Sequence, residues 1–129
     1  MNLKKIENEY GCYLDATSLS GILSCENDAI ELISACLSSG ASNLLLHERS
    51  VSPDFFRLRT GLAGAALNKF QIYHIRVALI VQDKPLLDGR FGEMVMESNK
   101  GNDFRVYDSV PAAEEWMLSA THDPAIQLG

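Results

Sequence analysis

The run Ile75 to Val81, IRVALIV, is the feature that most limits the folds open to this chain. All of its residues except Arg76 are apolar, and they follow one another without the alternation of a half-exposed strand. Continuous apolar runs of this kind are typical of strands that are covered on both faces, as at the centre of a parallel sheet. The run therefore predicts an α/β protein in which helices pack on a parallel sheet.

Strand-like and helix-like segments alternate around that run, which predicts a small, mostly parallel sheet with helices packed on it. An N-terminal hairpin is expected from segments 3–9 and 12–16, on either side of Tyr10-Gly11. Further strands are expected at 43–46 and 104–107. Helices are expected from an N-cap at Ser24 to a stop at Gly40, and over 53–70, 89–98 and 109–118, with Asn99 or Gly101 left-handed after the third.

Length and composition predict one domain without a membrane anchor. The 129 residues fit a single core, and we expect a domain over 1–120 followed by a loose tail over 121–129. No apolar run is long enough to span a bilayer, and the N-terminus MNLKKIENEYG lacks the apolar stretch of a secretory signal. The predicted location is the cytoplasm, with no membrane partner.

Cofactor and metal motifs do not occur in the sequence. The glycine-rich patterns GxGxxG and GxxxxGK[ST], the GxSxG elbow of hydrolases and the HExxH zinc pattern do not occur. Cys12, Cys25 and Cys36 match neither a CxxC pair nor a zinc ligand set, so we expect three reduced, mostly buried thiols. The prediction is therefore no cofactor and no metal.

Charge is distributed unevenly along the chain. The net charge is −6. Between Arg49 and Arg76, five basic residues and one acid, Asp54, give +4, so the remainder carries −10. An acidic chain with a basic centre is a poor nucleic-acid binder but a fair candidate for a local anion site or for association through opposite patches. The alternative is that these cations pair with acids on neighbouring elements.

The predicted helix over 53–70 carries polar residues and glycines where it should pack on a sheet. Ser52 is expected to cap it and Pro53 to begin it. On a helical wheel, Arg59 falls within the apolar arc, so we expect it to pair with Glu48 or Asp83 or to line a cleft, with extension to solvent as the alternative. The opposite wedge contains Asp54, Arg57, Thr60, Gly61, Gly64 and Asn68.

Two glycines on that wedge need a separate reason, because glycine costs a helix about 1 kcal/mol relative to alanine. We expect a neighbouring helix, a dimer partner or a ligand to approach the backbone there. Ligands of open α/β sheets bind outside the carboxyl ends of the strands, where Asp15, Asp83 and Asp108 are also expected. The candidate ligand-binding residues are His47, Glu48, Arg57, Arg59, Thr60, Gly61 and Gly64.

The segments LLLHERSVSPDFFRLRTGLAGAALNKF, YHIRVALIV and MESNKG resemble a bacterial family, the domain of unknown function 4180. Its members share the patterns LHE, SPxFFxLRTGLAGxxLxKF, RxAIV and ESNxG, and the likeness runs from about the first helix to Trp116. The element order is also similar to that of STAS domains, the anti-sigma-factor antagonist fold, whose members are usually non-catalytic regulatory or interaction domains. That resemblance places Ser52 where some STAS domains carry a phosphorylatable serine, but the Asp-Ser-Ser signature is missing and a helix cap is the better interpretation.

Two hypotheses on function follow. The first is a non-catalytic binding or regulatory module that acts as a homodimer or with another protein. The second is a small enzyme or an anion- or metabolite-binding protein that uses His47 or Glu48 as acid or base and Arg59 to hold the anion. The two differ in geometry, because an enzyme requires a pocket where these three side chains converge.

Overall fold

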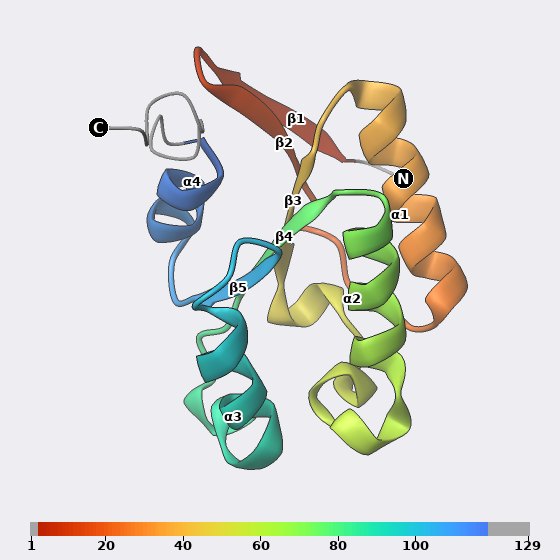
Figure 1. The fold of residues 1–129 in the computed structure, drawn as a ribbon, viewed down its shortest axis with the longest axis vertical. Helices are drawn as coiled ribbons and strands as arrows, with labels where there is room; N and C mark the ends of the chain where they lie inside the picture. Colours follow the sequence, from red (N-terminus) through yellow and green to blue (C-terminus); the bar gives the residue numbers. More distant parts are fainter. Residues whose placement is uncertain (1–2, 119–129) are drawn as a thin grey trace.

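The spatial order of the strands follows the order of the chain, β1-β2-β3-β4-β5, in one five-stranded sheet (Figure 1). The computed structural model describes residues 3–118. An antiparallel hairpin opens the sheet, and every later pair of neighbouring strands is parallel. The predicted mostly parallel sheet with an N-terminal hairpin is thus confirmed. The strands are β1 (Lys4–Asn8), β2 (Gly11–Asp15), β3 (Asn43–His47), β4 (Arg76–Ile80) and β5 (Phe104–Tyr107).

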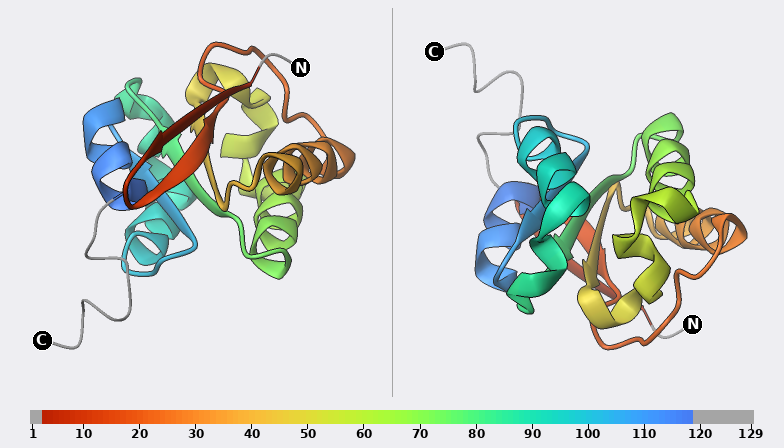
Figure 2. Two further views of the ribbon diagram at one scale, coloured as in Figure 1. Left: turned by 90° about the horizontal axis from the view of Figure 1, so that it is seen from above. Right: turned by 90° about the horizontal axis from the view of Figure 1, so that it is seen from below.

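Within residues 3–118, four α-helices cover the two faces of the sheet unequally. The larger apolar cluster lies under α1, α2 and α3, and the smaller one under α4 alone. Figure 2 shows α4 on the opposite side of the sheet from α1 and α2. Because each crossover joins adjacent strands with the same hand, the three crossover helices gather on one face. The helices are α1 (Glu26–Ser39), α2 (Leu62–Ile72), α3 (Gly89–Ser98) and α4 (Val110–Leu118).

Strand β4 explains the continuous apolar run. Val77 and Leu79 face the larger cluster, while Ala78 and Ile80 face the smaller one, and all four are at most 1% exposed. Both faces of this strand are therefore buried, as the sequence predicts.

The start of α1 differs from the expectation. Cys25, not Ser24, is the N-cap, and it makes no side-chain cap bond. The Ser24 hydroxyl instead donates to the Gly21 carbonyl, so the side chain bonds within the preceding turn. Its backbone N–H donates to Asp28 Oδ2. The predicted stop is confirmed: Gly40 is left-handed, with φ 73°, and closes the helix.

The end of α3 also differs. Neither Asn99 nor Gly101 is left-handed: Asn99 has φ −68°, and Gly101 has no positive φ. The Asn99 amide has another use, because it accepts a bond from Val106 N at 2.8 Å and donates one to Val106 O at 3.2 Å. It thereby ties the end of α3 to the edge strand β5.

The prediction of a single helix over 53–70 is wrong. The chain forms two 3-10 turns, η2 (Pro53–Phe56) and η3 (Leu58–Thr60), before α2 begins at Leu62. Arg57 is extended between them (φ −107°, ψ 95°), and Gly61 is left-handed (φ 81°). The Thr60 hydroxyl lies 2.8 Å from both the Asp54 and the Arg57 carbonyl oxygens, so a side chain competes with the helical backbone pattern.

Two further predictions concern the C-terminal tail and membrane spans. The loose tail predicted over 121–129 lies outside the described residues. Within residues 3–118, no helix has the length and apolar character needed to cross a bilayer.

Candidate functional site

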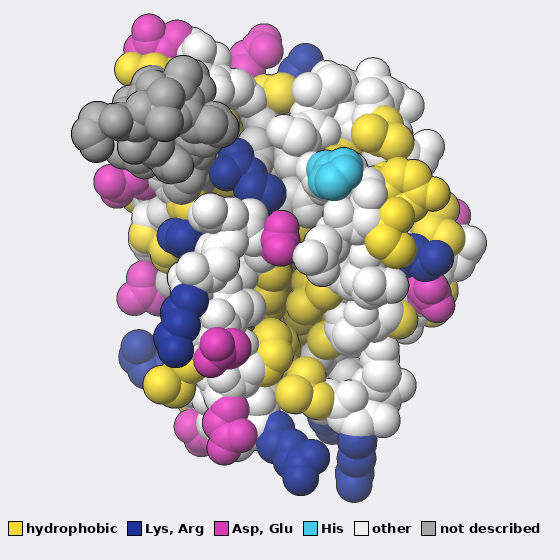
Figure 3. Space-filling view, in the orientation of Figure 1, with side chains coloured by type: hydrophobic (Ala, Val, Ile, Leu, Met, Phe, Trp, Pro, Cys, Tyr) yellow, Lys and Arg dark blue, Asp and Glu magenta, His cyan; other side chains and the backbone are white. Residues whose placement is uncertain are grey.

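An open hollow of about 500 Å³ lies where η2 and η3 meet the start of α3. The right-hand view of Figure 2 looks onto this end of the molecule, and Figure 3 shows Lys and Arg side chains reaching from it. We call it the arginine hollow, and its lining residues are Phe56, Arg57, Leu58, Arg59, Asp88, Arg90 and Phe91.

The arginine hollow is positively charged. Three arginines and one aspartate line it, which gives a net charge of +2. Arg57 lies 3.4 Å from Asp54, but both side chains are more than half exposed, so this pair is weak. The side chains of Arg59 and Arg90 are exposed and make no hydrogen bond or ion pair with any of residues 3–118. Their guanidinium groups keep the donors that bind carboxylate or phosphate oxygens.

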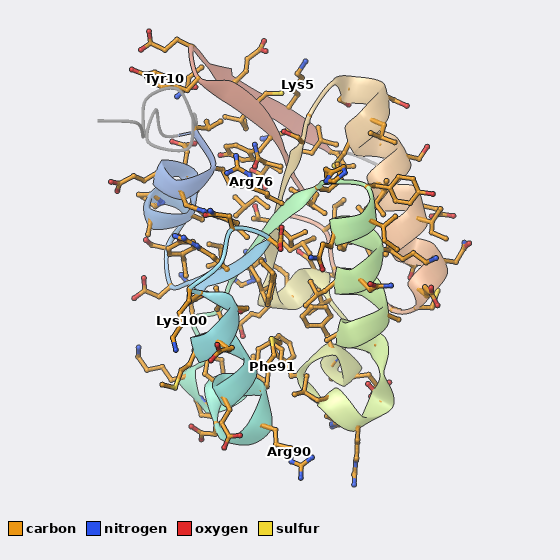
Figure 4. All side chains as sticks on the ribbon, viewed as in Figure 1. Lys5, Tyr10, Arg76, Arg90, Phe91 and Lys100 are labelled. Carbon is orange, nitrogen blue, oxygen red and sulfur yellow. The ribbon has the colours of Figure 1, made fainter. Side chains whose placement is uncertain are left out.

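Aromatic contacts join the two sides of the arginine hollow. The rings of Phe56, from η2, and Phe91, from α3, meet edge to face with centroids 4.9 Å apart. Phe55 lies behind them, 6.0 Å from Phe91, and is fully buried. Figure 4 shows Phe91 pointing inward from α3 while Arg90 extends from the end of the molecule. Because Arg90 directly precedes Phe91 in α3, the aromatic contact holds the arginines of both segments at one opening.

Gly92 sets the position of Arg90 and was not anticipated from the sequence. The turn η4 (Lys84–Leu87) runs into α3, and a Cβ on Gly92 would overlap the Leu87 carbonyl oxygen. Only glycine lets η4 lie this close to α3. Asp88, Arg90 and Phe91 were also missed. The available signal was topological: parallel crossover helices begin at the same end of a sheet, so Arg90 had to lie near the segment that contains Arg57.

Arg59 is not inside the protein, which corrects the expectation from the helical wheel. It is exposed, and it does not pair with Glu48 or Asp83. The wheel assumed an unbroken helix, and the extended residue Arg57 and left-handed Gly61 change the direction in which Arg59 projects. The expected pairing is therefore wrong, whereas the other expected outcome, that Arg59 lines a cleft, agrees with its place in the arginine hollow.

His47 and Glu48 are placed at the carboxyl end of β3 but do not line the arginine hollow. Glu48 Oε1 accepts backbone N–H groups from Gln82 at 2.7 Å and Asp83 at 3.0 Å. His47 Nδ1 accepts from Arg49 N at 3.2 Å, which caps a short 3-10 turn. Both side chains thus bind backbone near the ends of β3 and β4, and the structure does not bring them together with Arg59.

The remaining predicted site residues are Thr60, Gly61 and Gly64, and none of them lines the arginine hollow. The Thr60 hydroxyl bonds to nearby backbone carbonyls. Position 61 has a positive φ, which favours glycine. Gly64 is exposed, and apart from its chain neighbours and the backbone of its own helix, no atom of the described residues lies within 4 Å of where its Cβ would be. No neighbouring helix within residues 3–118 therefore approaches Gly64.

The three cysteines lie away from the arginine hollow and are not disulfide-bonded. Cys36 is buried, and burial raises the pKa of its thiol to about 12. Cys25 is exposed and Cys12 half-buried, so only one of the three fits the expectation of burial fully. Among residues 3–118, no three His, Cys, Asp or Glu side chains gather as metal ligands.

Comparison with known proteins gives one result. The family model described as Domain of unknown function (DUF4180) matches residues 11–117, which is most of the chain and contains the whole arginine hollow. No curated protein and no solved structure matches the chain.

Proposed function

The chain belongs to the DUF4180 family, and we propose that it is a non-catalytic binding or regulatory module that holds an anionic group in the arginine hollow. One observation carries the proposal: Arg59 and Arg90 come from different segments, share one opening, and have no acidic partner among residues 3–118. Cations left in this state are available to a ligand.

The size and chemistry of the arginine hollow favour a small molecule. Ligand clefts usually occupy about 300–1,000 Å³ and combine apolar walls with a few polar groups. Here Phe56, Leu58 and Phe91 supply the apolar wall, and the arginines supply the polar groups. We propose a carboxylate- or phosphate-bearing metabolite as the ligand.

The arrangement of the fold supports the regulatory part of the proposal. The order of elements along the chain is similar to that of STAS domains, and on that basis we propose a STAS-like module of the bacterial cytoplasm. Ser52 Oγ accepts a bond from Asp54 N at 3.2 Å, which supports a cap rather than a phosphorylation site. We also propose that the protein associates with a protein partner or with a second copy of itself. The open surface of α2 around Gly64 would be the contact.

Catalysis is not proposed, because the acid–base candidates are used elsewhere. Glu48 holds two backbone N–H groups, and His47 caps a turn. Neither faces the arginine hollow. As general acid or base, His47 or Glu48 would have to lie beside the bound anion, and neither does.

A thermal-shift series with inorganic phosphate, pyrophosphate and citrate, at matched ionic strength in chloride, tests the proposal. A ligand at about 100 times its Kd stabilises the folded state by about 2.7 kcal/mol. We expect the melting temperature to rise with at least one of these anions and the rise to be lost in the double variant Arg59→Gln/Arg90→Gln.

The matched control removes the same charge elsewhere, as Lys5→Gln/Lys100→Gln. Both lysines are exposed and form only weak surface pairs with Glu7 and Glu97; Figure 4 marks their positions. Equal loss in the two double variants would show a general charge effect and would refute the site. Light scattering of the same samples measures whether the chain is a dimer.

A further inference from the structure

We propose that the ligand of the arginine hollow is an anionic amphiphile, whose charged head binds the arginines and whose alkyl chain lies in a groove between α2 and α3. This inference rests on the proposed function, because it assigns the class of molecule that the same site takes. It adds a second binding surface that an anion alone would not use.

The groove has an apolar floor. It encloses about 250 Å³ between the two helices. Leu67 and Phe70 line it from α2, Met94 from α3 and Phe104 from β5. It is open because α2 packs on β4 and α3 packs on β5, and the two helices barely touch each other. Apolar surface left open in this way gains free energy when an alkyl chain covers it.

The groove and the arginine hollow follow one another along α3. Phe91 lines the hollow, and Met94, one turn further along α3, lines the groove. Beneath both, the fully buried Phe55 packs against Phe91 of the hollow and Phe104 of the groove, with ring centroids 6.0 Å and 6.3 Å away. Figure 3 shows hydrophobic side chains running along the valley between α3 and α2 toward the cationic end. From Arg90 to Glu97, seven residues along α3, the distance is about 10 Å at 1.5 Å per residue.

Charge at the two ends fixes the direction of the ligand. The arginines lie at the start of α3, whereas Glu97 and Asp103 line the other end of the groove. An anionic head at the far end would meet these carboxylates, while at the near end it meets Arg59 and Arg90. The small volume of the groove suits a single alkyl chain better than the side chains of a docked protein helix, whose interfaces are several times larger.

The methionines provide a direct test by NMR. Met94 lies in the groove, Met96 is 72% exposed on the same helix, and Met117 is buried under α4 on the opposite face. With ¹³C-methyl-methionine protein, we titrate acetate, octanoate, decanoate and dodecanoate below their micelle concentrations. We expect the Met94 methyl signal to shift and those of Met96 and Met117 to stay. Affinity should rise by roughly two- to fourfold per added methylene.

Headgroup and groove are then varied separately. Decyltrimethylammonium should bind at least tenfold more weakly than decanoate, and Arg59→Gln/Arg90→Gln should weaken decanoate binding. Leu67→Gln should lower the gain per methylene, whereas Leu37→Gln, at an exposed leucine of α1, should not. The unmodified protein gives the chain-length result independently of whether these variants fold.

The outcomes separate this inference from the function on which it rests. If acetate or phosphate binds at the arginines but decanoate binds no tighter and Met94 does not move, the groove is not used and only the amphiphile is refuted. If decanoate and the cationic amphiphile bind equally, or if nothing binds, both proposals fail. Both proposals are supported if the shift of the Met94 methyl signal grows with alkyl chain length and is lost in Arg59→Gln/Arg90→Gln.

Discussion

Gly61 and Gly64 lie one turn apart at the start of α2, but they are glycines for different reasons. Gly61 has φ 81°, a conformation that L side chains avoid, whereas Gly64 has helical geometry and open space above it. A shared explanation by close approach is therefore unnecessary. The difference predicts opposite effects for the same substitution.

Replacing each glycine by alanine tests this. Gly61→Ala should destabilise the fold by about 1–2 kcal/mol, because alanine is strained in the left-handed region. Gly64→Ala should stabilise it by up to about 1 kcal/mol, because alanine is the better helix former. Urea denaturation measures both, and Gly61→Asn, which tolerates positive φ, is the control for strain. Two variants that shift stability in the same direction would contradict the assignment.

At the scale of elements, the break before α2 decides where the arginines point. The Thr60 hydroxyl lies within bonding distance of the Asp54 and Arg57 carbonyls and 3.3 Å from Leu62 N, so one side chain joins η2, η3 and α2. Because it is exposed, water competes for these bonds, and their net contribution is modest.

Thr60→Val removes the hydroxyl and keeps the shape of the side chain. We expect a loss of about 1 kcal/mol of stability and a weaker response to anions, because Arg57 and Arg59 lose their fixed positions. Thr60→Ser, which retains the hydroxyl, should behave like the unmodified protein. If valine and serine have the same effect on melting temperature and on the anion response, the hydroxyl does not hold this junction.

The sequence predicted elements well where burial alone determines them. The run 75–81 identified β4, and Gly40, Gly89 and Ser52 marked element ends that the structure confirms. Apolar periodicity could not show the break at Arg57 and Gly61, because the competing bonds come from a threonine side chain to nearby backbone. Arg57 and Arg59 were named as site residues, but their partners Arg90 and Phe91 are joined to them only by tertiary contacts.

At the scale of the whole molecule, buried acidic groups predict how stability changes with pH. Burial raises the pKa of Cys36 from its ordinary value of 9.0 to about 12. Burial and the hydrogen bond to Glu114 raise the pKa of Tyr13 as well. A raised folded-state pKa gives stability that is complete below the unfolded-state value and is lost as pH rises toward the folded-state value.

The free energy of unfolding should therefore fall above about pH 9, with Cys36 contributing a slope of up to about 1.4 kcal/mol per pH unit. Cys36→Ala should be less stable near neutral pH because it leaves a cavity, but its stability should fall less steeply between about pH 9 and about pH 11. Urea titrations across this range measure the slope. An unchanged slope in the alanine variant would show that the thiol does not titrate with unfolding.

The central claim is that three arginines from two separate segments act as one anion site. The most direct measurement is a titration of ¹⁵N-labelled protein with pyrophosphate while the arginine Nε–Hε signals are followed. We predict that the signals of Arg57, Arg59 and Arg90 shift together with one Kd, while that of Arg105, which donates to the Gly101 carbonyl at 2.8 Å, stays in place. Separate, non-saturating shifts spread over all arginines would contradict the claim.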